Sequence, residues 1–148
     1  MKKIRIVDND ELRNEIDKIY SSLNQVVLAK WSLKLAKHII HIANFDTNRY
    51  PEIQEGFEMN ELWQIGKARM HDVRQIGFKI HRLAREQSDE LSKTIFRVIG
   101  HAIASAHMKE HSLVASDYAI KVVNLLYMNN LDKVKEERIW QLDKLKEM

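Results

Sequence analysis

The stretch Val98–Tyr118, VIGHAIASAHMKEHSLVASDY, decides the fold of this chain. From Val98 to Ala106 the only ionisable side chain is that of His101. The helix that this periodicity predicts is small or apolar nearly all round, and such helices are buried and contacted by neighbours on several sides. Gly100 and the alanines around it would let a second helix approach closely. We therefore predict a buried central helix over about residues 88–108.

The composition of the chain favours one all-α domain. Its 148 residues suffice for a compact core, and 45% of them are hydrophobic against 30% charged. One proline and four glycines leave little punctuation for a fold with many turns, while helix formers dominate. We predict an all-α, single-domain bundle of about six to seven helices over residues 1–148. The absence of cysteine excludes a disulfide scaffold and a thiolate metal site.

Apolar residues at helical spacing predict the other helices, and capping residues indicate their ends. Asp8 with Glu11 fits a capping box that would open the first helix. The predicted helices cover about residues 10–21, 25–43, 51–66, 68–85, 112–127 and 131–147. In the fifth of these, Asp117 could pair with Lys121 four residues on. The apolar side of the last helix consists of Leu131, Val134, Leu142 and Leu145. The lead-in MKKIRIV is too short to assign and is interpreted as frayed.

Charges of one sign gather on three of the predicted helices. A basic stripe on helix 25–43 is interpreted as a solvated face. It consists of Lys30, Lys34, Lys37 and His41. Acidic residues dominate helix 51–66 and basic residues helix 68–85. These two helices either pair with each other or form separate halves of a binding surface. The candidate partner surface consists of Glu52, Glu55, Glu58, Arg74, Lys79 and Arg82.

The histidines are the candidates for chemistry. His107 and His111 lie four residues apart, so a continuous helix would point both imidazoles the same way, as a divalent metal requires. A third ligand would have to come from His81 or His101. Two ligands do not make a site, so we predict no metal. We interpret the histidines as a hydrogen-bonded polar seam or the edge of a pocket.

Other functional classes lack their sequence signals. A Gly-x-Ser-x-Gly motif, a phosphate loop and a dinucleotide fingerprint are absent, so we predict neither an enzyme nor a cofactor. The net charge of +3 and the lack of a reading motif argue against nucleic acid. No signal peptide or membrane-spanning run is found, so we expect a cytoplasmic protein without a membrane partner. The oligomeric state stays open, a homodimer included.

The central run also carries a family resemblance. Gly100-His101-Ala102-Ile103-Ala104-Ser105-Ala106-His107, followed by His111 and Tyr118-Ala119, resembles the motif of one family of small, all-helical immunity proteins of bacterial polymorphic toxin systems. Weaker matches fall in the same order upstream: Trp31, Asp46, Arg49, Pro51, Trp63, Gly66, His81 and Ala84. The resemblance covers about residues 29–123. The chain departs from the family at Tyr50, which separates Arg49 from Pro51, at Ser112 in place of alanine, and in the Ile, Arg and Lys content of helix 68–85.

The resemblance implies a cytosolic protein that binds a cognate toxin and neutralises it by occlusion, with no chemistry of its own. Six residues transfer as motif positions whose role, structural or partner-binding, stays open: Arg49, Trp63, His81, His101, His107 and His111. The competing hypothesis is a small helical-bundle enzyme that uses a metal held by the histidine cluster.

Overall fold

A computed structural model describes residues 2–148 and shows that they form seven helices and no strand, with 73% of the chain helical. The helices are α1 (Asp10–Tyr20), α2 (Gln25–Ile42), α3 (Pro51–Gln64), α4 (Met70–Glu86), α5 (Glu90–Ala104), α6 (Glu110–Leu126) and α7 (Leu131–Lys146). The prediction of an all-α single domain is confirmed.

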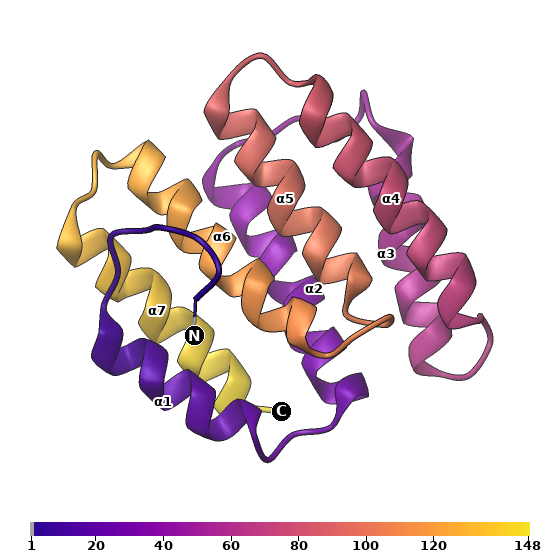
Figure 1. The fold of residues 1–148 in the computed structure, drawn as a ribbon, viewed down its shortest axis with the longest axis horizontal. Coiled ribbons are helices and arrows are strands. Elements are labelled where there is room, and N and C mark those ends of the chain that lie inside the picture. The colour runs from indigo at the N-terminus through magenta and orange to yellow at the C-terminus, as the bar shows by residue number, and fades with distance from the viewer. Residues whose placement is uncertain (1) are drawn as a thin grey trace.

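Helix α5 is the buried centre of the bundle, as predicted. It packs against α2, α3, α4 and α6, and Figure 1 shows it between α4 and α6 with α2 behind it. Gly100 is buried and Ala104 is only 8% exposed, so both sides of the helix are covered. The lack of charge around α5 therefore reflects contact with neighbours on several faces.

The central helix is shorter than predicted: it ends at Ala104, whereas the sequence predicted an end near Met108. Its last carbonyl groups accept hydrogen bonds from side chains of two other helices. Asn60 of α3 donates to the carbonyl of Ile103 at 2.8 Å, and Gln25 of α2 donates to that of Ser105 at 2.9 Å. These donors satisfy the groups that a longer helix would have paired internally. His107 consequently lies in the turn before α6.

Gly100 allows α4 and α5 to approach closely. A Cβ atom on Gly100 would lie 2.7 Å from the ring of His81 on α4. Gly77 of α4 faces the same contact, where a Cβ would lie 4.0 Å from the carbonyl oxygen of Gly100. At the end of α3, Gly66 adopts a φ of +75°, which confirms the predicted helix stop.

The first residues of the chain are docked, which corrects two predictions. The N-cap of α1 is Asn9, whose side chain accepts a hydrogen bond from the Leu12 backbone N–H at 3.0 Å. Asp8 is instead used in a buried ion pair. The lead-in is not frayed over residues 2–7, because Val7 exchanges two hydrogen bonds with Asn124 of α6, at 2.8 and 2.9 Å. Residue 1 lies outside the described residues.

One prediction about a polar pair is also wrong. Asp117 does not pair with Lys121, because α7 and α1 supply arginines to Asp117, and Lys121 pairs with Glu90 at 2.9 Å. On the apolar side of the last helix, Val134, Leu142 and Leu145 are buried, whereas Leu131 is 63% exposed. Within residues 2–148, no helix is long and apolar enough to span a bilayer.

Candidate functional site

The four motif histidines meet in one place, which we call the histidine seam: His81 of α4, His101 of α5, His107 of the following turn and His111 of α6. The Nδ1 atoms of His101 and His111 lie 2.9 Å apart. The ring centroids of His81 and His101 are 4.7 Å apart, and those of His107 and His111 are 5.5 Å apart. Helices α4, α5 and α6 thus build the seam together. No continuous helix carries His107 and His111.

Burial favours the neutral form of three histidines of the seam, His81, His101 and His111. Burial, followed by the nearby Arg97, lowers the pKa of His81 to about 4. Burial, followed by the charge of His81, lowers the pKa of His101 to about 3. Burial also lowers the pKa of His111. Two neutral imidazoles can share one hydrogen bond, with one ring as donor and the other as acceptor.

Two further residues fix the rings of the seam. The guanidinium of Arg97 donates from Nη1 to Nδ1 of His81 at 2.7 Å. The ring of Tyr118 stacks on His101 with centroids 5.3 Å apart. The contact with Arg97 has no sequence signal, because it joins α4 to α5 across 16 positions. Nδ1 of His107 is buried and has no hydrogen-bond partner in the structure.

The space beside the seam is small. A cavity of about 80 Å³ beside His101 and His111 is far smaller than the roughly 300 Å³ at which ligand pockets begin. Glu110 lines this cavity but pairs with Lys3 of the N-terminal segment. Within residues 2–148, no three His, Asp or Glu side chains are placed to hold a metal ion.

The other two motif residues lie away from the seam. Arg49 is exposed in the turn before α3, and Trp63 is half-buried against the core at the end of α3. The inserted Tyr50 has a clear packing role. Its ring meets Phe96 of α5 edge-on, with centroids 4.9 Å apart.

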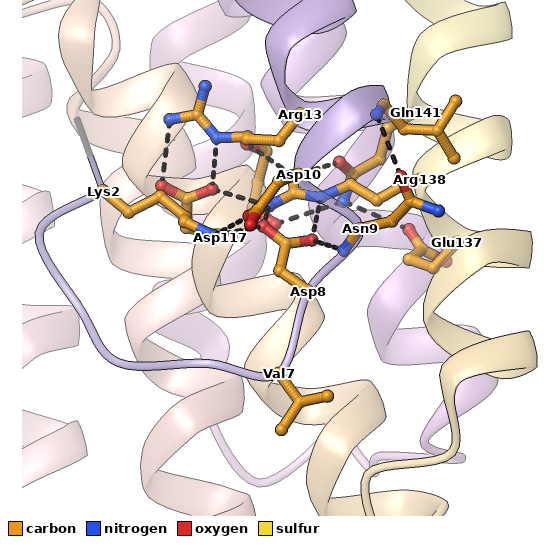
Figure 2. A network of polar contacts seen from close by, with 12 residues as sticks. Lys2, Val7, Asp8, Asn9, Asp10, Arg13, Asp117, Glu137, Arg138 and Gln141 are labelled. Atoms are coloured by element: carbon orange, nitrogen blue, oxygen red, sulfur yellow. Dashed lines mark hydrogen bonds and ion pairs between the residues drawn. The ribbon is translucent and has the colours of Figure 1, made fainter.

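A buried ion network, shown in Figure 2, joins the two ends of the chain. Arg138 of α7 is fully buried, and its Nη2 lies 2.7 Å from Asp8 and 2.8 Å from Asp117 of α6. Arg13 of α1 donates from Nε to Asp117 at 2.7 Å. Burial alone would raise the pKa of Asp8, but Arg138 outweighs it and the pKa is lowered. Four separate segments are therefore held by complementary charges.

Sequence reasoning missed this network, although one signal was available. Arg138 and Gln141 lie four and seven positions after Val134, so they share the buried face of α7 with Val134 and Leu145. A face defined only by apolar residues leaves them out. No signal along the chain links Asp8 to a residue 130 positions away.

The charged faces of α3 and α4 point to solvent and do not neutralise each other. Glu55 and Glu58 are exposed, as are the basic residues of α4 in the candidate partner surface, whereas Glu52 is half-buried. Within residues 2–148 no ion pair joins α3 to α4. Internal pairing of the two helices, one of the two alternatives, is therefore wrong. Arg74 instead lies over the ring of Phe78, which is 48% exposed.

One comparison with known proteins gives a match. A family model described as Imm-5 like putative immunity protein matches residues 18–148. The matched span reaches beyond the stretch 29–123 that carries the motif resemblance, and it includes α7 with Arg138. No curated protein and no solved structure matches the chain.

Proposed function

The chain belongs to the Imm-5 like putative immunity protein family, and on that premise we propose that it neutralises a cognate toxin of a bacterial polymorphic toxin system. It does so by covering a surface that the toxin needs, without chemistry of its own and in the cytoplasm. The family match over residues 18–148 is the observation that carries this proposal.

The exposed charges of α3 and α4 support a protein partner. Glu55 and Glu58 form an acidic surface, and Arg74, Lys79 and Arg82 form a basic surface on the neighbouring helix. A toxin with the complementary pattern would associate faster, and wrong partners would be repelled. Within residues 2–148 these charged side chains make no ion pair, so their charges are available for such a partner.

The interior supports occlusion as the mechanism. Occlusion needs a surface of fixed shape, and the histidine seam holds α4, one of the helices that carry this surface, against α5 and α6. In the seam His101 and His111 are hydrogen-bonded to each other, and His81 is hydrogen-bonded to Arg97. We infer that Arg49 and Trp63, which lie outside the seam at the two ends of α3, border the partner surface.

Co-expression tests the proposal. The toxin domain encoded beside this gene is produced in a bacterial host with and without this protein. Growth should stop with the toxin alone and recover with both, and the two proteins should elute together in size-exclusion chromatography. A catalytically dead toxin controls for expression burden. Neither recovery nor a complex would contradict the proposal.

A further inference from the structure

A groove runs between α2 and α3, and we call it the lysine groove. One end encloses about 550 Å³ between the exposed stripe of α2 and the end of α3, where Glu61 and Ile65 line it. Beyond Lys37 lies a second hollow of about 430 Å³, lined by Tyr50 and Phe57. Lys37 lines both hollows and stands between them, paired with Glu61 of α3.

The walls of the groove are apolar. Leu33 lies in its floor at 3% exposure, and Ile65 stands on its rim at 65% exposure. In the second hollow, Phe57 is 3% exposed and the ammonium group of Lys37 lies 5.4 Å from its ring centroid. A partner side chain in this groove would cover the exposed side chain of Ile65, and this burial of apolar surface is favourable.

The lysines of the groove carry more charge than the groove neutralises. Lys37 pairs with Glu61 at 3.2 Å, and both side chains are about half exposed. Lys30 and Lys34 line the same hollow, and no acidic side chain within residues 2–148 lies within ion-pair distance of either. The groove therefore offers positive charge beside apolar surface.

The spacing of the lysines selects the shape of the occupant. Lys30, Lys34 and Lys37 lie at i, i+4 and i+7 on one line of α2, which spans about 10 Å at 1.5 Å per residue. A helix laid along the groove repeats the same spacing, with acids at every turn and apolar residues beside them. We infer that the lysine groove binds an acidic amphipathic helix of the toxin. This inference rests on the function proposed above and names the contact that this function uses.

A nucleic acid fits the groove less well. Glu61 lies inside it, and Glu58, one turn earlier on α3, is exposed. These carboxylates would repel a phosphate backbone, whereas an acidic helix can keep its apolar side toward α3. The exposed Ile65 also gives a polyanion nothing to bind.

Charge reversal tests the inference with the neighbouring-gene toxin as the probe. We expect the double variant Lys30→Glu/Lys34→Glu to raise the Kd for the toxin by at least about tenfold, since the loss of desolvated charge contacts weakens binding by this factor or more. The matched control is Lys135→Glu/Lys146→Glu, which reverses two exposed lysines of α7 that make no ion pair within residues 2–148. The control should change the Kd by less than about twofold. Circular dichroism of both variants confirms an unchanged fold.

Apolar truncation tests the walls independently of charge. Ile65→Ser removes the apolar rim, and Leu131→Ser removes a side chain of nearly equal exposure, 65% against 63%, on α7. We expect Ile65→Ser to raise the Kd for the toxin severalfold and Leu131→Ser to leave it unchanged.

The outcomes separate this inference from the proposed function. If the toxin binds wild type and all variants equally, the groove is not the contact, and the proposed function survives. If wild type does not bind the toxin, the function fails. The groove is then tested with a peptide of about five helical turns, leucine on one face and glutamate beside it, by fluorescence anisotropy. Binding that Lys30→Glu/Lys34→Glu abolishes supports the groove, and no binding overturns it. Equal or tighter binding of duplex DNA, lost in the same variant, would also overturn it.

Discussion

Arg138 shows how much of this fold depends on single buried charges. It contacts Asp8 and Asp117, and its side chain is fully buried. Arg138→Met removes one partner and leaves two buried carboxylates less compensated. We expect a loss of about 3–5 kcal/mol in the free energy of unfolding, measured by urea denaturation. Arg82→Met, at an exposed position of α4, should change it by less than about 0.5 kcal/mol.

A double variant checks the cause of that loss. If the loss comes from unpaired carboxylates, Arg138→Met combined with Asp8→Asn should cost less than the sum of the two single changes. Strict additivity would show that Arg138 stabilises the fold by its packing alone.

The histidine seam predicts a pH dependence of stability. His81 and His101 have folded-state pKa values of about 4 and about 3, below the ordinary value of 6.5. Between pH 6.5 and pH 4 the unfolded chain therefore binds more protons than the folded chain, so stability falls as the pH drops through this window. The urea midpoint should fall accordingly, and less steeply in His101→Gln. The lowered pKa of Asp8 adds to this fall mainly at the acid end of the window and below it, because the ordinary pKa of an aspartate is 3.8. A flat midpoint from pH 6.5 to 4 would contradict the neutral seam.

At the scale of elements, the contact between α4 and α5 depends on which glycine is replaced. Gly100→Ala would place a Cβ 2.7 Å from the His81 ring and should cost about 1–3 kcal/mol. Gly77→Ala meets nothing nearer than 4.0 Å and should gain up to about 1 kcal/mol from helix propensity. Thermal and urea unfolding of the two variants measures both. Equal effects would show that the helices do not meet as described.

Sequence reasoning predicted these elements well where the signal was local. The absence of charge around Gly100 predicted the buried position of α5, and apolar periodicity with caps predicted each helix to within a few residues. The end of α5 was missed because Asn60 and Gln25, distant in sequence, satisfy its last carbonyl groups. Local signals cannot contain such partners.

The candidate site also has a part that the sequence predicted and a part that it could not predict. The interpretation of the histidines as a polar seam agrees with the contacts among His81, His101, His107 and His111, which belong to segments that pack on one another. That interpretation could not show that Arg97 and Tyr118 hold their rings, or that Lys3 reaches Glu110 from the other end of the chain. Those contacts depend on the packing of whole helices.

At the scale of the whole molecule, the two ends of the chain close the bundle together. Helices α1 and α7 lie side by side, and Figure 1 shows the N-terminal segment leading into them. The ion pair between Asp8 and Arg138 connects these ends, with 2.7 Å between the carboxylate oxygen and the guanidinium nitrogen. The bundle is therefore closed by charge at one side, while its charged outer faces on α2, α3 and α4 stay open to a partner.

Titration of the toxin's activity tests occlusion most directly. Increasing amounts of this protein are added to a fixed amount of the toxin encoded beside its gene, and residual toxin activity is measured after short and long incubation. Occlusion without chemistry predicts a linear fall that reaches its minimum at the equimolar point and does not change with time. Inactivation by far less than an equimolar amount, progressing with incubation, would mean that this protein turns over, and would contradict the account.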